Sequence, residues 1–267
     1  MDDDTPKPAT AARIYDYYLG GVHNFPADRE AARQVIAMYP FIPAAARANR
    51  AFLGRAVRFL ADAGIRQFLD IGSGIPTGGN VHEIAQGIAP DARVVYVDID
   101  PVAVAESQEI LDGNRNAIAI LADLREPQAI LDHSGVRRLL DFTRPVGLLL
   151  AAVLHFVPDD PQAYAVVDHL VGALAPGSYL VASHTATETF MPITAQVPAQ
   201  EDVYRRRTAT PGTVRTRAEV GRFFTGLELL DPGVVRADLW RPDAGEQVTD
   251  PQARPDTGIW AAVGRKP

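Results

Sequence analysis

The sequence contains no cysteine and no apolar run long enough to cross a membrane. The absence of cysteine excludes disulfides, thiolate metal sites and a cysteine nucleophile, and it is compatible with the reducing cytoplasm, where we expect the protein. The most apolar run, 146–157, is shorter than the about 20 residues that span a bilayer. The acidic N-terminus lacks the basic start and apolar core of a signal peptide. These absences predict a protein that has no membrane partner.

Basic residues are fewer than acidic residues, 26 against 33, which gives a net charge of -7. This balance repels polyanions, so nucleic acid is not an expected partner. The exception is a run of arginines that we interpret as a solvated helix face, with docking of an anionic substrate as the alternative. Its members are Arg205, Arg206, Arg207, Arg215, Arg217 and Arg222.

The hydrophobic pattern predicts an α/β protein with a doubly wound, mostly parallel sheet. Apolar strand-like runs alternate with segments that can form helices, whereas the last two apolar runs have no helix between them and predict an antiparallel C-terminal hairpin. The predicted organisation is a disordered tail at 1–10, an N-terminal helical cap or lid at 11–64, and a core at 65–267 with a loop or lid at about 185–216. The predicted parallel strands are 67–71, 93–97, 117–122, 146–154 and 178–183.

Four sequence signals predict where helices begin. An acid followed by proline occurs at Asp100-Pro101 and at Asp160-Pro161, where the acid can cap and the proline can occupy the first turn. Thr216 with Glu219 reads as a capping box. Asn80 with Glu83 offers the same reciprocal cap just after a glycine-rich turn, so the amino end of that helix is predicted to face a ligand.

The glycine-rich turn follows the first predicted strand in "FLDIGSGIPT", residues 68–77. Ligands of this fold class bind at that position, and Gly72 and Gly74 allow close approach. A dinucleotide site would have a third glycine where Thr77 stands, and Asp70 would repel a diphosphate but attract an ammonium or sulfonium group. Further acids end the next two strands.

Asp98 ends the second strand, where an acid can accept hydrogen bonds from both ribose hydroxyls. Asp123 follows the third strand, within reach of an adenine amino group. Either acid could instead be an ordinary turn residue or a solvated strand-end acid. Together with Asp70 they favour a nucleoside ligand that carries positive charge.

Several longer motifs resemble those of class I S-adenosylmethionine-dependent methyltransferases: "FLDIGSGIPT", "VVYVDIDPVAV", "LADL", "LHFVPDD" and "LAPGSYLVASH". With "ARIYDYYLGGVHNFPADREAA" and "GIWAAVGRKP", the chain is similar to one family of predicted methyltransferases long carried as a domain of unknown function. The resemblance implies a Rossmann-like methyltransferase fold and an S-adenosylmethionine site. The residues it implicates, with their immediate neighbours, are Asp70, Gly72, Ser73, Gly74, Asp98, Ile99, Asp123 and Leu124.

Other side chains are candidates for the rest of the site. Asn49 or Arg50 could reach the carboxylate of the cofactor's methionine, with a surface ion pair as the alternative for the arginine. His155 follows the fourth strand and is the candidate catalytic base. His184 lies at the end of the fifth strand and is a candidate substrate contact. An interior histidine satisfied by the backbone is the alternative for both.

The segment "IYDYYLGGVHNF" combines aromatic residues with paired glycines, and it could close over the pocket or only pack against the core. In the first case it contributes Tyr15, Tyr18, His23 and Asn24 to substrate binding. No cluster has convincing metal-ligand spacing, so no metal is expected.

These features favour a methyltransferase that uses S-adenosylmethionine and a small-molecule substrate. One alternative is a nucleoside-binding sensor or regulatory protein without chemistry. The other, a nicotinamide-dependent oxidoreductase, is disfavoured by Asp70 and Thr77 and by the lack of a catalytic Tyr–Lys or His–Asp pair.

Overall fold

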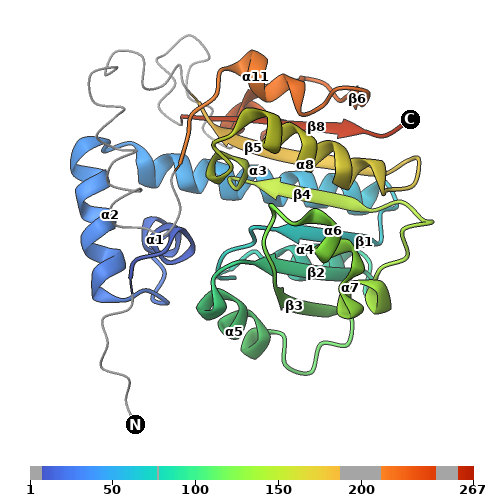
Figure 1. Ribbon diagram of the computed structural model, residues 1–267, viewed down its shortest axis with the longest axis horizontal. Coiled ribbons are helices and arrows are strands. Elements are labelled where there is room, and N and C mark those ends of the chain that lie inside the picture. The colour runs from blue at the N-terminus through green and yellow to red at the C-terminus, as the bar shows by residue number, and fades with distance from the viewer. Residues whose placement is uncertain (1–7, 77, 187–211, 245–257) are drawn as a thin grey trace.

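The centre of the protein is one β-sheet, shown in Figure 1 in a computed structural model that describes residues 8–76, 78–186, 212–244 and 258–267. The strand order is β3-β2-β1-β4-β5-β8-β6, and β7 also pairs with β8. The five strands from β3 to β5 are parallel. They are β1 (Gln67–Ile71), β2 (Arg93–Asp98), β3 (Ala117–Leu121), β4 (Gly147–Ala151) and β5 (Tyr179–Thr185). The predicted doubly wound sheet is confirmed.

The C-terminal strands are antiparallel, as the sequence predicts. The last strand, β8 (Ile259–Arg265), pairs antiparallel with β5 along its whole length. On its other side it pairs with β6 (Glu228–Leu229) and β7 (Val235–Arg236), which are only two residues long each. The last apolar run therefore lies beside the parallel strands, and the run before it in sequence lies at the sheet edge.

Helices cover both faces of the sheet. One face packs against α3 (Ile42–Asp62), α4 (Val81–Ile88) and α5 (Pro101–Ile110), together with the short 3-10 helix η3 (Ala237–Leu239). The opposite face packs against α6 (Pro127–Asp132), α7 (Ser134–Leu139), α8 (Asp160–Gly172) and α11 (Arg217–Arg222). Strands buried on both faces need apolar residues at successive positions, which explains why these strands read as continuous apolar runs.

Most of the predicted helix starts are confirmed. Asp100 caps α5 through Val102 N at 2.9 Å, and the capping boxes of α4 and α11 are present. The prediction for α8 was wrong by one residue: Asp159 is the cap, since its side chain accepts from Gln162 N at 2.9 Å, and Asp160 is already helical. Asp160 is thereby free to bind an arginine elsewhere in the chain.

Two N-terminal helices, α1 (Ala11–Tyr18) and α2 (Pro26–Met38), form a separate small core with the start of α3. Figure 1 shows them beside the sheet, at the end where the parallel strands finish. Of the predicted tail at 1–10, Ala9 is buried and Thr10 caps α1, so these two residues belong to the folded part. Residues 1–7 of that tail lie outside the described part, as do Thr77, Arg205, Arg206, Arg207 and most of the predicted loop at about 185–216.

Candidate functional site

A cavity of about 550 Å³ opens at the carboxyl ends of the parallel strands. Its walls come from the glycine turn, from the segments that follow β2, β3 and β4, and from α1 and α3. The cavity collects most of the site residues predicted from the sequence. They are Tyr15, Tyr18, Asn49, Arg50, Asp70, Gly72, Ser73, Gly74, Asp98, Ile99, Asp123, Leu124 and His155.

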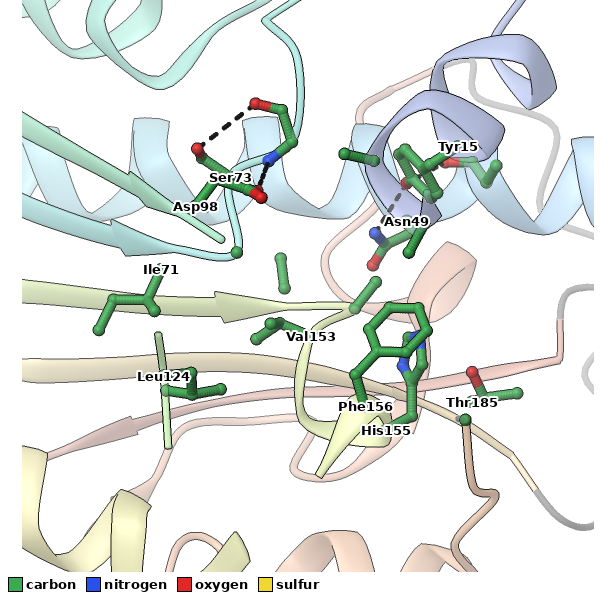
Figure 2. Close-up of a pocket in the computed structure, with 18 of the residues that line it drawn as sticks. Tyr15, Asn49, Ile71, Ser73, Asp98, Leu124, Val153, His155, Phe156 and Thr185 are labelled. Atoms are coloured by element: carbon green, nitrogen blue, oxygen red, sulfur yellow. Dashed lines mark hydrogen bonds between the residues drawn. The ribbon is translucent and has the colours of Figure 1, made fainter. Parts of the chain in front are cut away.

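The glycine turn is fastened to the neighbouring strand β2. Gly72 N and Ser73 N both donate to Val97 O, at 2.8 and 3.2 Å. Gly74 N donates to Asp98 Oδ2 at 2.8 Å, and Figure 2 shows the Asp98 carboxylate facing the turn. Asp98 Oδ1 accepts from Asp100 N at 2.9 Å, so each carboxylate oxygen is held by one backbone N–H. An ionised carboxylate can accept further hydrogen bonds, which leaves Asp98 able to bind a ligand.

Gly72 is needed for two independent reasons. Its φ is +73°, and a Cβ at this position would lie 2.2 Å from Val153 Cγ2, in the segment after β4. Gly74 also has a positive φ, +64°, but no atom lies within 4 Å of a Cβ there. Of these two glycines, only Gly72 lies against the segment after β4 closely enough to exclude a side chain.

Replacing Gly72 with alanine is expected to lower the free energy of unfolding by at least about 2 kcal/mol, since the left-handed backbone and the clash with Val153 both add cost. Gly74→Ala is the matched control, with an expected loss of about 1–2 kcal/mol from the backbone alone. Urea denaturation of the two variants measures the difference. Equal losses of unfolding free energy in the two variants would show that Val153 moves away from the new Cβ without an energetic cost.

Asp70 is a buried carboxylate on β1. Burial raises its pKa to about 7, the positive charge of Arg50 opposes the rise, and the charge of Asp98 adds to it. Burial likewise raises the pKa of Asp98. Arg50 itself donates to Gly78 O at 3.0 Å and to Asn80 Oδ1 at 2.8 Å, so it fixes the loop that leads into α4. The part of the cavity lined by Asp70 and Asp98 is therefore more acidic than basic, which favours a cationic ligand.

Asp123 follows β3 and is partly exposed. Its carboxylate binds the Arg125 guanidinium, with Nε 2.9 Å from both oxygens, and accepts from Arg125 N at 2.9 Å. Burial alone would raise its pKa, but the hydrogen bonds and charge of Arg125 leave that pKa below its usual value. Ile99, beside it on the cavity wall, exposes 51% of its surface and offers an apolar face to a ligand.

A chain of hydrogen bonds crosses the cavity wall from α1 to β4. Asn49 Nδ2 donates to Tyr15 Oη at 2.9 Å, and Ser183 Oγ donates to Asn49 Oδ1 at 2.6 Å. Ser183 Oγ in turn accepts from Ala152 N at 2.9 Å. Ala152 has a φ of +54°, which is costly for a residue with a side chain. Ser183 was missed in the sequence, although a serine within an apolar strand was a usable signal.

His155 lies on the 3-10 helix η1 (Leu154–Phe156) and lines the cavity beside Phe156, 4.2 Å between ring centroids. Its Nδ1 is buried without a hydrogen-bond partner. Burial and the charge of Arg215 lower the pKa of His155 to about 3. The ring is therefore neutral at physiological pH, and it is a weak proton acceptor, because a general base works best with a pKa near the working pH.

His184 does not line the cavity; it packs behind His155, 5.6 Å between ring centroids. Its Nδ1 donates to Thr185 O at 2.8 Å and its Nε2 accepts from Arg215 Nη1 at 2.7 Å. Both nitrogens are thus engaged, and burial holds the pKa of His184 well below its usual value. In this arrangement His184 supports the site from behind and contacts no substrate in the cavity.

Arg215 corrects the interpretation of the arginine run as a solvated face. It is buried, and it donates to Leu154 O at 3.1 Å and to Val157 O at 2.9 Å. Its Nη2 lies 2.8 Å from Asp160 Oδ1, the carboxylate that does not cap α8. Arg215 therefore clamps η1, the element that carries His155. These contacts could not be predicted from a local motif, because they join residues 55 to 61 positions apart.

The predicted lid segment contributes only part of its candidates to the cavity. Tyr15 and Tyr18 line it. His23 does not, since its Nδ1 lies 2.8 Å from Glu106 Oε2 on α5. Asn24 is also outside, and its Nδ2 donates to Asp16 Oδ2 at 2.7 Å. Both side chains hold the turn between α1 and α2 in place.

A buried ion-pair cluster that the sequence did not reveal ties α1 to α5. Arg13 Nε lies 2.9 Å from Asp28 Oδ2, and its Nη1 lies 3.1 Å from Asp100 Oδ2. Thr10 Oγ1 also donates to Asp100. Because Asp100 N donates to Asp98, the N-terminal helices are connected to the site through one residue.

The described ranges contain no helix that is long and apolar enough to span a bilayer. They also contain no group of three or more His, Asp or Glu side chains arranged to hold a metal ion.

The profile of a family described as S-adenosyl methyltransferase matches residues 2–267. The chain is similar to a candidate methyltransferase from Thermobifida fusca YX, with 42% identity, a TM-score of 0.87, and coverage of 98% of this chain and 96% of the other. It is similar to a DUF574 family protein from Streptomyces avermitilis MA-4680, with 43% identity, a TM-score of 0.89, and coverage of 97% and 98%.

More distant structures show the fold alone. An O-methyltransferase family protein from Burkholderia thailandensis has 15% identity and a TM-score of 0.53, with 80% of this chain and 55% of the other covered. A search of curated proteins finds no match.

Proposed function

The chain belongs to the S-adenosyl methyltransferase family, and from that premise we propose that it transfers the methyl group of S-adenosylmethionine to a small molecule bound in the same cavity. The observation that carries the proposal is the Asp98 carboxylate, held at the end of β2 and facing the glycine turn. When bound, the cofactor supplies an electrophilic methyl group on a sulfonium.

The residues at the acidic end of the cavity fit such a ligand. Asp98 is placed to accept hydrogen bonds from ribose hydroxyls, and Asp70 to pair with the ammonium of the methionine moiety. Asp123 lies where an adenine amino group could donate to it. Burial and Asp98 raise the pKa of Asp70 although Arg50 opposes the rise, so the ionised carboxylate would gain from a further cation in the cavity.

Methyl transfer in this cavity depends mainly on positioning. Alignment of two bound reactants can supply about 7–11 kcal/mol of a barrier. The hydrogen-bond chain through Tyr15, Asn49 and Ser183 connects α1 to the segment after β4. Arg215 holds η1 through its hydrogen bond to Leu154 O. His155 is neutral and suited to a hydrogen bond with the acceptor, whereas its low pKa limits it as a base.

Calorimetric titration tests the cofactor assignment. We expect S-adenosylhomocysteine to bind, and NAD and NADP not to bind. A mass-spectrometric assay for methylated product then separates an enzyme from a nucleoside-binding sensor with the same site. Binding of NAD in preference to S-adenosylhomocysteine would overturn the proposal.

The affinity for S-adenosylhomocysteine is expected to fall by up to about tenfold from pH 8 to pH 6. Asp70 has a pKa of about 7, so it is mostly ionised at pH 8 and mostly protonated at pH 6, and only the ionised form attracts an ammonium group. In Asp70→Asn this part of the pH dependence should disappear. Calorimetry at the two pH values measures both proteins, and an unchanged slope in the variant would exclude Asp70 as the titrating group.

The melting temperature of Asp70→Asn shows independently whether this variant is folded. A carboxyl whose pKa rises on folding weakens the folded state progressively between its unfolded pKa and pH 7, and fully above pH 7. Asp70→Asn should therefore melt at a higher temperature than the parent at pH 8 in the absence of ligand.

A further inference from the structure

The cavity divides into two parts of different chemistry on either side of Val153. All charged side chains among its described lining residues come from the strand ends β1 to β3, the segments just after them, and α3: Arg50, Asp70, Asp98, Asp100, Asp123 and Arg125. In Figure 2, Ser73 and Asp98 lie on one side of Val153, and Tyr15, His155, Phe156 and Thr185 lie on the other. We call this second part the acceptor half.

The acceptor half is walled by aromatic and aliphatic side chains. Tyr15 and Phe41 pack into the small N-terminal core together with Val214, and Phe156 lies on η1 opposite them. No described side chain of this half carries a charge. A charged molecule entering it would lose its hydration without finding a counter-ion among the described side chains, which is costly in an apolar site.

Part of the hydrogen-bonding capacity in this half is already used by the protein itself. Tyr15 Oη already donates to Ala46 O at 3.0 Å and accepts from Asn49. His155 keeps a buried Nδ1 without a partner, and its ring is held in place by the clamp of Arg215 on η1. Because Nδ1 is buried, a hydroxyl group in the cavity can reach only Nε2, which donates or accepts according to the tautomer of the neutral ring.

We infer that the acceptor half binds an uncharged, largely apolar molecule with a hydroxyl group that meets His155, and that this hydroxyl is the methyl acceptor. The inference rests on the proposed function. Transfer forms the bond between the hydroxyl oxygen and the methyl carbon and breaks the bond between sulfur and that carbon. The electron pair of the broken bond stays on sulfur, and the hydroxyl proton leaves to solvent.

Four probes with one ring system test the inference in protein saturated with S-adenosylhomocysteine. They are 2-naphthol, naphthalene, 2-naphthoate and (2-naphthylmethyl)ammonium. We expect 2-naphthol to bind at least about tenfold more tightly than either charged probe, because the charges would be buried unpaired. It should bind roughly threefold to tenfold more tightly than naphthalene, the range expected for one hydrogen bond.

His155→Phe keeps a ring but removes both nitrogens. In this variant the advantage of 2-naphthol over naphthalene should disappear while naphthalene binds as before. His169→Phe is the matched control, the same substitution at an exposed histidine on α8 that does not line the cavity, and it should keep the advantage. If His155→Phe does not fold, the probe series on the parent protein still decides the charge preference.

The inference is overturned if a charged probe binds as tightly as 2-naphthol, if none of the four binds, or if His155→Phe keeps the hydroxyl preference. These outcomes are distinct from failure of the proposed function. Loss of the inference alone leaves S-adenosylhomocysteine binding intact, whereas absence of that binding at the first titration removes the proposed function itself.

Discussion

Arg13→Met is expected to lower the free energy of unfolding by about 3–5 kcal/mol, the range measured when one partner of a buried ion pair is removed. The side chain of Arg13 is 3% exposed and lies between Asp28 and Asp100, which are almost as buried. Methionine fills much of the same volume but leaves two carboxylates close together without their shared cation. Urea denaturation monitored by circular dichroism measures the loss.

Arg33→Met is the matched control on α2. Arg33 pairs with Glu30 at 3.0 Å, but both side chains are more than half exposed. Exposed pairs contribute about 0–1 kcal/mol, so the control should hardly change stability. A loss below about 1 kcal/mol for Arg13→Met would mean that the two carboxylates find other partners or water once the arginine is gone.

The fold was predictable because it is encoded locally. Alternating apolar runs and helical segments specify strands and crossovers, and a parallel sheet covered on both faces follows from them. The caps Asp100 and Thr216 could be read from a few neighbouring residues. The cap of α8 could not be resolved to one residue, since Asp159 and Asp160 are both acids ahead of the same proline.

The cavity wall around the glycine turn was predictable for a similar reason. Residues that follow parallel strands meet at one edge of the sheet, so Asp70, Asp98 and Asp123 had to lie near one another whatever their roles. Their environments could not be read in the same way. Asp70 is buried and Asp123 is paired with Arg125, and these differences depend on packing that no short motif encodes.

The contacts that sequence reasoning missed are long-range. Arg13 reaches Asp100 across 87 positions, and Ser183 reaches Asn49 across 134. Arg215 was expected on the surface because arginines usually are exposed, yet it supplies three elements with hydrogen bonds from a buried position. Each of these contacts fixes a wall of the cavity, so the sequence located the site better than it explained what holds the site together.

Asp98→Asn is expected to weaken the binding of S-adenosylhomocysteine by about a hundredfold, or about 3 kcal/mol. The carboxylate is proposed to accept hydrogen bonds from ribose hydroxyls while it holds Gly74 N and Asp100 N. Asparagine keeps the size but loses the charge. Its NH₂ group must also face one of the backbone N–H donors, so either the turn or the ligand contact is lost.

Calorimetric titration measures the change, with Asp91→Asn as the matched control. Asp91 is exposed in the turn before β2, at the opposite end of the strand from Asp98, and its replacement should leave affinity within about threefold, since isolated surface charges contribute little. A thermal melt without ligand separates a folded Asp98→Asn from an unfolded one. If folded Asp98→Asn binds S-adenosylhomocysteine as tightly as the Asp91 control, Asp98 does not bind the ribose. The segment after β2 would then act only through its bonds to the glycine turn.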